Sequence, residues 1–525
     1  MYDILIKNGL VFNGLPEDPF QAPIAIQKGK IVKIGGEIRE KEAKIVINAE
    51  GKYITPGFID INNSADHYLG LISAPEAPNL IKQGITTIVT GNCGASLAPL
   101  VNGSLKFLYP WTRSKDINVN WNYLNEFLCL LEKREMGVNL ATLVGWNTIR
   151  TNIAGEEFKP LNKEELEKCL FLLKESLEQG AWGVSFGLGY PSEQAVGFKE
   201  IIEASKIIKK YQGLMSFHLR NERDNFLTAV EELIEISQKT NANIQISHFR
   251  VCDKSRWNDF KIALDKIENS NQQKKTNINF DIVPYESSVE SLYSVIPQWL
   301  AAEGKKAMEK NLKDKKIRQN FVKILKQNRQ FYKDIIVADA NNNLRIKNQS
   351  LNSLAKNFGL SLEETIVKLL ETEKEQILVY NKNISESNII SALQSQISMV
   401  SSNSTSINLD NPNNVAFFHQ SSYGAFPKFF SYFVKSKQIC SWKEAVYKTT
   451  YLPATKLGLQ NKGLIKKNYD ADIVVINPLT IQDETTEKNP FVFPRGIDNV
   501  IINGIVVLNK GKLSYKKAGR ILRKK

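Results

Sequence analysis

The middle of the chain contains three short apolar runs: Trp182-Gly-Val-Ser-Phe186, Leu214-Met-Ser-Phe217 and Ile244-Gln-Ile-Ser247. Two longer stretches separate them, at residues 200–211 and 226–239, and their apolar residues recur with the period of a helix. Short strands that alternate with amphipathic helices are typical of parallel sheets, because the helix carries the chain back to the start of the next strand. This part of the chain therefore predicts successive βα units.

The same alternation extends from this region in both directions. Further strand-like runs are Gly57–Ile61, Thr86–Thr90, Leu140–Val144, Ile278–Ile282 and Ile397–Val400. Together with the first three runs they make a set large enough to close a barrel. The sequence therefore predicts an α/β fold, a (β/α)8 TIM-like barrel.

Both ends of the chain have a different pattern, in which short strands follow one another without helices. Asp3–Lys7 is one such run near the N-terminus, and Asp472–Ile476 is one near the C-terminus. Closely spaced strands with polar turns indicate a small β-sandwich. We expect residues 1–55 and 459–525 to form one β-sandwich domain beside a barrel domain at residues 56–458.

A Lys- and Asn-rich stretch at about residues 300–390 interrupts the barrel pattern. Lysine pairs such as Lys305-Lys306 are typical of the solvated face of a helix. A connection of this length is uncommon in a compact domain unless it has structure of its own. The stretch therefore predicts a helical insertion beside the mouth of the barrel.

The net charge of +14 and the isoelectric point of about 9.2 raise the question of a nucleic-acid partner. Most lysines are scattered along the chain, and only the tail at residues 515–525 is a basic cluster. Proteins that bind nucleic acids concentrate their charge on one face and carry a reading motif, and we find no such motif. The composition favours a soluble protein that binds no nucleic acid.

The cysteines indicate a reducing compartment. Their number is odd and they are widely spaced, which argues against a disulfide framework: Cys93, Cys129, Cys169, Cys252 and Cys440. The N-terminal run Met1–Lys7 has an acid at position 3 and does not resemble a signal peptide. No stretch approaches the roughly 20 apolar residues of a membrane helix. We expect a cytoplasmic protein that has no membrane partner.

Residues that bind metals stand at the ends of three predicted strands: Cys93, His218 and His248. Catalytic residues of α/β barrels lie at these carboxyl ends, and the chain has only four histidines. One thiolate and two imidazoles suffice to hold a catalytic zinc ion with an open fourth position. A pair of structural histidines beside a small buried cysteine is the alternative interpretation.

A series of short motifs runs nearly from end to end of the chain. They are Thr55-Pro-Gly-Phe-Ile-Asp60, Gly91-Asn-Cys-Gly94, Gly187-Leu-Gly-Tyr-Pro191, His218-Leu-Arg-Asn-Glu222, Ser247-His248, Pro284-Tyr285, Tyr423-Gly-Ala-Phe-Pro427, Leu452-Pro-Ala-Thr-Lys-Leu-Gly458, Ala471-Asp-Ile-Val-Val475 and Ile502-Asn-Gly504. In these motifs and in their order, the chain resembles the N-acyl-D-amino-acid deacylases (D-aminoacylases) of the amidohydrolase superfamily. The resemblance implies a (β/α)8 barrel with a β-sandwich made from both termini.

The resemblance also implies a site and a substrate class. It implies one zinc ion and a small N-acyl amino acid or related amide as substrate. The residues that match the ligands of the family's tightly held zinc are Cys93, His218 and His248, and those that match its substrate-binding residues are Arg150, Tyr190, Tyr285 and His419.

Several reactive positions of the family are replaced in this chain. Its His-x-His pair on the first strand is Asn62-Asn-Ser64 here, and its essential aspartate is Asn403. The arginine that is expected to hold the substrate carboxylate is Ser421, the histidine of a Gly-His pair is Trp146, and one tyrosine is Val283. An amide cannot accept a proton from water at neutral pH. The departures predict an impaired or altered site.

Two functional hypotheses follow from these departures. In the first, the protein is an amidohydrolase with one zinc ion, and another group replaces the missing base. By position the candidates are Asp66, which we place in the catalytic set beside Asn403, and His67, Glu222 and Asp281. In the second, the chain is a non-catalytic descendant that binds zinc or a ligand. Turnover with added zinc separates the two.

Overall fold

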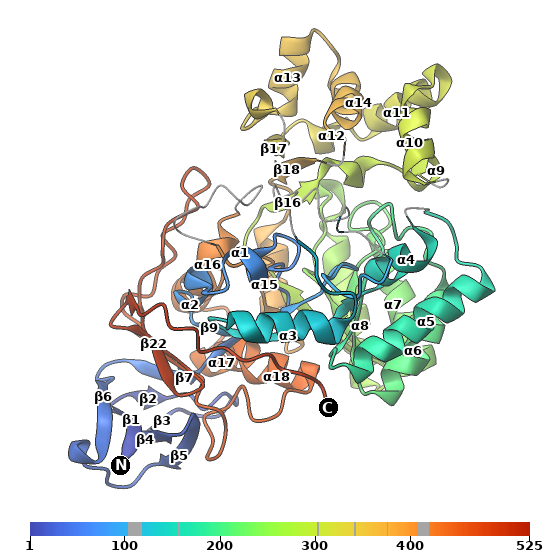
Figure 1. Cartoon of the computed structure of the whole chain (residues 1–525). Coiled ribbons are helices and arrows are strands. Elements are labelled where there is room, and N and C mark those ends of the chain that lie inside the picture. Colours follow the sequence, from blue (N-terminus) through green and yellow to red (C-terminus); the bar gives the residue numbers. More distant parts are fainter. Residues whose placement is uncertain are drawn as a thin grey trace.

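Parallel strands lie at the centre of the molecule, with helices around them (Figure 1). The computed structural model describes residues 1–102, 105, 118–155, 158–301, 304–340, 343–374, 376–407 and 419–525. Within these residues the central strands are β8 (Phe58–Asp60), β9 (Ile85–Thr90), β10 (Asn139–Thr142) continued by β11 (Val144–Gly145), β12 (Gly183–Gly187), β13 (Leu214–His218), β14 (Asn243–Ile246), β15 (Asn277–Ile282) and β19 (Ser398–Val400).

The central strands form a ring. Strands β8, β9 and β10 pair in parallel, and so do β11, β12, β13, β14, β15 and β19 in that order. Between the two groups, the amide of Leu143 donates to the carbonyl of Thr90 at 2.9 Å. At the opposite join, just past β19 and β8, the amide of Asn403 donates to the carbonyl of Asn62 at 3.0 Å. The first bond joins the two groups of strands, and the second joins the last strand to the first and closes the ring.

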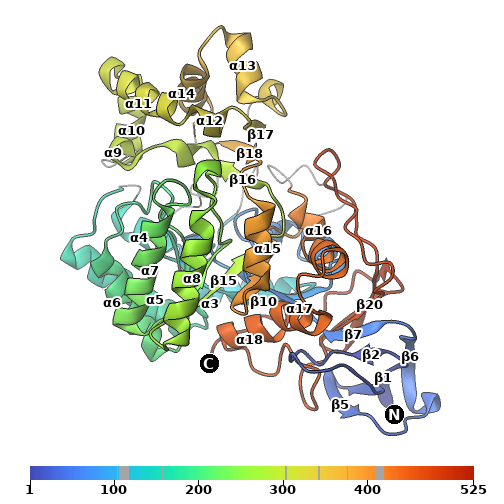
Figure 2. The same ribbon diagram turned by 180° about the vertical axis from the view of Figure 1, so that it is seen from behind.

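The helices around the strands are amphipathic, as their sequences predict. In α6, Ile201 and Ile208 are buried, whereas Lys209 and Lys210 are exposed. Figures 1 and 2 show the helices on the outside of the ring. None of the helices in the described residues has both the length and the apolar composition to cross a membrane. The helices are α1 (Gly70–Ser73), α2 (Pro78–Ile81), α3 (Leu124–Arg134), α4 (Trp146–Ala154), α5 (Lys163–Glu178), α6 (Phe198–Lys210), α7 (Phe226–Thr240), α8 (Asp259–Gln272), α15 (Glu386–Gln394), α16 (Ser421–Lys428), a π-helix (Phe429–Ser436), α17 (Trp442–Thr449) and α18 (Tyr451–Leu457).

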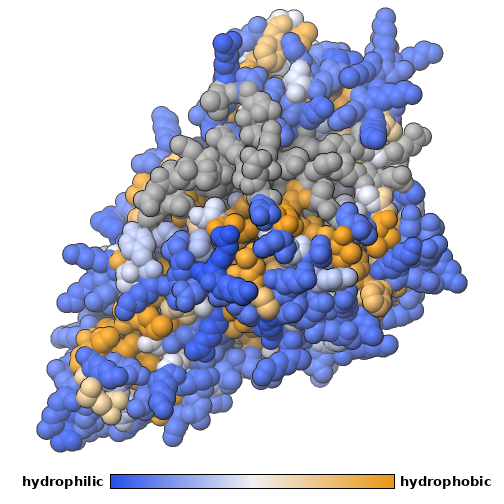
Figure 3. Space-filling view, viewed as in Figure 1, coloured by the Kyte–Doolittle hydropathy of each residue, from blue (hydrophilic) through white to orange (hydrophobic). Residues whose placement is uncertain are grey.

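The insertion forms a separate lobe at the top of Figure 1, between β15 and α15. It contains a sheet as well as helices: β16 (Ser288–Ser291) and β17 (Ile336–Ala340) both pair antiparallel with β18 (Ile377–Asn381). Its apolar side chains form a core of their own, and mostly hydrophilic side chains cover its outer face (Figure 3). Its helices are α9 (Gln298–Ala301), α10 (Lys305–Lys313), α11 (Lys315–Gln327), α12 (Arg329–Tyr332), α13 (Leu351–Phe358) and α14 (Leu362–Thr372).

Strands from the two ends of the chain lie in one sheet. Its central pair is β7, from the N-terminal segment, and β20, which runs antiparallel to β7. A second sheet, of order β5-β4-β1-β6, packs on it, and their shared core includes Ile4, Ile26 and Val475. The members are β1 (Tyr2–Lys7), β2 (Leu10–Val11), β3 (Phe20–Gln21), β4 (Ile24–Gln27), β5 (Lys30–Ile34), β6 (Ala43–Asn48), β7 (Tyr53–Pro56), β20 (Ile473–Ile476), β21 (Ile497–Ile502), β22 (Ile505–Asn509) and β23 (Lys512–Leu513).

We propose that residues 1–55 and 459–525 fold as one domain, and a deletion tests this proposal. Without residues 459–525, β7 loses its antiparallel neighbour and its apolar core partners. Because unpaired strand edges associate readily, we expect the truncated protein to be insoluble. Solubility and cooperative unfolding are the measurements, and a soluble truncation that unfolds cooperatively would contradict the proposal.

Two substitutions in the same sheet provide a matched pair for this test. Val475 in β20 is fully buried in the core that the two sheets share, whereas Ile505 in β22 is 41% exposed. A carboxylate at the buried position would have neither water nor an ionic partner, so Val475→Asp should lower the free energy of unfolding by more than about 3 kcal/mol. Ile505→Asp should change it by less than about 0.5 kcal/mol.

Candidate active site

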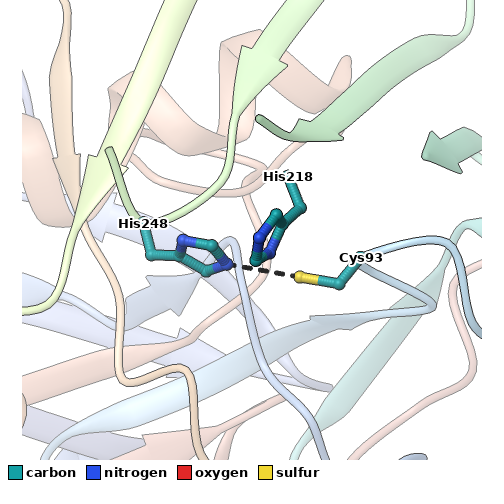
Figure 4. Close-up of side chains that lie close together, drawn as sticks. All are labelled: Cys93, His218 and His248. Atoms are coloured by element: carbon teal, nitrogen blue, oxygen red, sulfur yellow. Dashed lines mark hydrogen bonds between the residues drawn. The ribbon is translucent and has the colours of Figure 1, made fainter. Parts of the chain in front are cut away.

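The three predicted metal-binding residues come together at the carboxyl end of the strands (Figure 4). One ligand atom from each of Cys93, His218 and His248 lies within 4.8 Å of the others. The Cys93 Sγ is 3.4 Å from the His248 Nε2, and the two imidazole rings meet edge to face with their centroids 4.6 Å apart. Parallel neighbouring strands place their ends at the same edge, which is why residues far apart in sequence converge.

The backbone around these residues adopts left-handed conformations. The φ angle is +52° at Cys93, +36° at His248 and +45° at Asn403. Such angles are uncommon in residues other than glycine and cluster at functional sites. At Gly94 a side chain is impossible, because a Cβ would lie 1.7 Å from the Glu193 Oε1. The turn that contains Cys93 is therefore packed closely against Glu193.

The electrostatic surroundings of the two histidines differ. Burial lowers the pKa of His218 to about 3, so its imidazole is neutral, the form that binds metals. Burial alone would lower the pKa of His248 too, but Glu222, with a contribution from Cys93, raises it to about 10. The His248 Nδ1 is 3.0 Å from the Glu222 Oε1. With Glu222 at its Nδ1, the ring directs its Nε2 toward Cys93, and this nitrogen can bind a metal ion once its proton has been lost.

Asp281 is buried beside His248 and is not among the described residues that line the cavity. Its carboxylate accepts hydrogen bonds from the Ser401 Oγ at 2.5 Å, the Gln245 Nε2 at 2.9 Å, the His248 amide at 3.0 Å and the Asn62 Nδ2 at 3.2 Å. The side chain is fully buried. Asp281, one of the candidate bases predicted from the sequence, thus has four hydrogen-bond donors from the protein. Through these bonds it holds the ends of neighbouring strands together.

The residues that replace the family's reactive groups contact one another. The Ser64 Oγ donates to the Asn403 Oδ1 at 3.2 Å, and both residues line the cavity. Asp66 lies below them: its carboxylate accepts from the Gly91 amide at 2.7 Å and contacts the His67 Nδ1 at 2.9 Å. Asp66 thus supports the turn that leads to Cys93. It is not among the described residues that line the cavity, whereas His67 is.

A cavity of about 620 Å³ is lined in part by Cys93, His218 and His248. The barrel contributes its floor, and Ile324, Asn328, Phe331 and Tyr332 of the insertion line its far side. Three arginines along its wall are paired with carboxylates: Arg220 with Glu232 at 2.8 Å, Arg223 with Glu290 at 3.2 Å and Arg250 with Glu222 at 2.9 Å. A cavity of this size can enclose a small-molecule ligand.

The predicted substrate-binding residues separate into two groups. Tyr190 and His419 line the cavity, and the His419 Nε2 is 2.9 Å from the Ser287 Oγ. Arg150 and Tyr285 are not among its described lining residues. The Arg150 Nη1 is 2.5 Å from the Glu200 Oε2, and the Tyr285 hydroxyl donates to the Asp483 Oδ2 at 2.7 Å. Both of these side chains thus have carboxylate partners that are not among the described lining residues: Glu200 is buried, and Asp483 is half-buried.

Sequence reasoning missed two charged residues beside the metal-binding group. Arg250 follows His248 by two residues, a spacing that predicts no function by itself. Glu193 lies in a turn, and the sequence around it matches no motif that we identified. The structure places Arg250 against Glu222 and Glu193 against Gly94. Each supports a residue that was predicted.

Comparison with known proteins agrees with this geometry. The family model described as "Amidohydrolase family" matches residues 385–507. The D-aminoacylase of Alcaligenes xylosoxydans xylosoxydans is 24% identical over 99% of this chain and 97% of its own length. The N-acyl-D-aspartate deacylase of the same organism is 24% identical over 99% and 95%. Over nearly its whole length, the chain is thus similar in sequence to D-aminoacylases and related deacylases.

Solved structures extend the comparison to the fold. The N-acyl-D-glutamate deacylase of Bordetella bronchiseptica, which was crystallised with zinc and a phosphonate inhibitor, superposes with a TM-score of 0.83. It is 24% identical, and the match covers 99% of each chain. A D-aminoacylase structure gives the same TM-score over the whole of both chains. The α/β fold predicted from the sequence is confirmed.

Glu193 gives this site a testable dependence on pH. Burial raises its pKa from 4.5 to about 8, so the folded protein holds this proton more tightly than the unfolded chain does. Wild-type stability should then fall as the pH rises from about 4.5 to about 8. Glu193→Gln has no proton to lose, so its stability relative to wild type should be at least about 2 kcal/mol more favourable at pH 8.5 than at pH 5. Urea unfolding at both pH values measures this, and an equal difference at the two would contradict it.

Proposed function

We propose that this protein is a zinc-dependent amidohydrolase that acts on amide C–N bonds outside peptides, with an impaired or altered active site. The observation that carries the proposal is the convergence of Cys93, His218 and His248 at the carboxyl end of the barrel strands, facing the cavity. The relatives named above include deacylases of N-acyl-D-amino acids. We propose a small N-acyl amino acid or related amide as the substrate.

One zinc ion fits the donor atoms of this site. A thiolate and two imidazole nitrogens are ligands that zinc prefers, and three protein ligands leave one position open. Zinc in such a site supplies Lewis acidity, which activates water and polarises the amide carbonyl. Cys93, His218 and His248 would hold the ion, and Tyr190 and His419 would contact the substrate from the cavity wall.

The impairment follows from the residue at position 403. Asn403 lines the cavity where the family has its catalytic aspartate, and its Oδ1 accepts a hydrogen bond from Ser64. A carboxamide has no basic site at neutral pH, so it cannot take a proton from water or return one to the leaving amine. Loss of a general base commonly lowers the rate by about 100- to 10,000-fold.

The candidate substitute bases all have other partners in the structure. Glu222 contacts His248 and Arg250, and Asp281 accepts the four hydrogen bonds described above. Asp66 binds the Gly91 amide and His67. Each of these carboxylates is thus already engaged with protein groups. These contacts support slow chemistry.

In the family, an arginine on the cavity wall is expected to hold the carboxylate of the substrate. In this chain the corresponding position is uncharged. Ser421 stands where the family has arginine, and its Oγ is 2.9 Å from the His419 Nδ1. Burial lowers the pKa of His419 to about 3, so this imidazole is uncharged at neutral pH. An amide that lacks a carboxylate therefore suits this wall better than an N-acyl amino acid does.

A non-catalytic descendant that binds zinc or a ligand is the second candidate function. The same departures favour it, because the cavity and the three metal-binding residues are present while Asn403 replaces the base. We also propose a cytoplasmic location, which the five free cysteines support.

The metal proposal predicts the zinc content of two serine variants. Wild-type protein should contain one zinc ion per chain, and Cys93→Ser should contain almost none, because serine is a poor zinc ligand. Cys169→Ser alters a buried cysteine in α5 that is not in the metal-binding group, so it should keep its zinc. Elemental analysis of the folded proteins measures this. Equal zinc in wild type and Cys93→Ser would remove Cys93 from the site.

The activity proposal predicts a gain from Asn403→Asp. With added zinc, wild-type protein should release amine from N-acetyl-D-amino acids several orders of magnitude more slowly than an intact family member. Asn403→Asp restores a carboxylate and should raise the rate by about 100-fold. Asn403→Ala is the matched control, because it removes the amide without adding a base. Fast wild-type turnover would refute the impaired site, and inactivity of all three would favour the non-catalytic candidate.

A further inference from the structure

Glu222 lies between the two histidine-bearing strand ends. It follows His218 by four residues, and its side chain, only 9% exposed, reaches across to the residues after β14. Its Oε1 is 3.0 Å from the His248 Nδ1, and its Oε2 accepts a hydrogen bond from the Arg250 Nε at 2.9 Å. The carboxylate thus contacts the imidazole on the side that faces away from Cys93.

The Glu222 Oε1 and the His248 Nδ1 have no other polar partner among the described residues. Both atoms are buried, and neither has a hydrogen-bond partner in the described part of the chain, so the 3.0 Å contact between them is the polar contact that each of them makes. A buried polar atom without a partner is costly. The carboxylate therefore fixes the rotation of the ring, which directs its other nitrogen, Nε2, toward the Cys93 Sγ at 3.4 Å.

The main chain of the same residue joins the two loops. The carbonyl of Glu222 accepts a hydrogen bond from the Cys252 amide at 2.7 Å. One of these loops begins after His218 and the other after His248, so Glu222 sets the separation of two ligand-bearing segments through its backbone as well as its side chain. Arg250, which is 11% exposed, offsets the charge of the buried carboxylate.

We infer that Glu222 is a positioning residue of the metal site, which presents the Nε2 of His248 to the ion in the correct orientation. It is not the replacement for the missing base, because both of its carboxylate oxygens already have partners. Carboxylates that orient metal-binding histidines in this way typically contribute 10- to 100-fold to metal affinity. The inference rests on the metal site proposed above.

The test is the zinc affinity of Glu222→Gln, measured by competition with a chelator. The amide keeps the size of the side chain but presents a weaker acceptor to His248, so affinity should fall about 10- to 100-fold. Glu232→Gln is the matched control, because it removes the carboxylate partner of Arg220, another arginine of the cavity wall, and Glu232 has no contact with a histidine. Its zinc affinity should equal that of wild type.

Two further measurements separate positioning from a general effect on folding. Unfolding in the presence of excess chelator should show Glu222→Gln folded, and the absorption spectrum of its Co²⁺ form should differ from that of wild type, because the ligand geometry has changed. Should Glu222→Gln fail to fold, Glu222→Asp replaces it. Aspartate keeps the charge for Arg250 but is too short to reach His248, so its zinc affinity should also fall.

The outcomes distinguish a failure of this inference from a failure of the metal-site proposal on which it rests. If Cys93→Ser loses zinc while the Glu222 variants bind it as tightly as wild type, with an unchanged Co²⁺ spectrum, Glu222 is not a positioning residue and the metal site stands. If Cys93→Ser binds zinc like wild type, the metal site is wrong, and the inference is overturned with it.

Discussion

The carboxylate of Asp281 connects the ends of the strands that carry the site. It lies on β15 and accepts hydrogen bonds from Asn62 beyond β8, from Gln245 and His248 at the end of β14, and from Ser401 beyond β19. A buried carboxylate needs such donors, and the donors come from segments that are far apart in sequence. The position of His248, and through it that of the metal-binding group, depends on this one side chain.

Much of this arrangement could be predicted from the sequence, for a geometric reason. Parallel strands end at one edge, so Cys93, His218 and His248 were expected to converge, and they do lie together. No comparable rule predicts where a side chain on a helix or a loop will point. Arg150 and Tyr285 have the expected residue types, but their partners are Glu200 and Asp483, outside the cavity lining.

The insertion shows another limit of sequence patterns. Its strands β17 and β18 are short apolar runs within Lys- and Asn-rich sequence, and the surrounding helical periodicity dominated the prediction. They pair with each other only because helices on either side fold into a core of their own. Pairing between distant segments depends on tertiary contacts, which a single sequence does not reveal. The same applies to Glu193, whose role depends on its contact with Gly94.

The replaced residues form a neutral set that is consistent with a single metal ion. As a metal ligand, Cys93 would supply one negative charge, and the carboxylate of Glu222, which contacts His248, is paired with Arg250. A second divalent cation would lie near Asn62, Ser64 and Asn403, none of which carries a charge. The nearby carboxylates of Asp60 and Asp281 are held by hydrogen bonds from the protein, and burial raises the pKa of Asp60 to about 6. Because an uncompensated charge in a buried site is expensive, the neutral side chains of Asn62, Ser64 and Asn403 support our proposal of one ion.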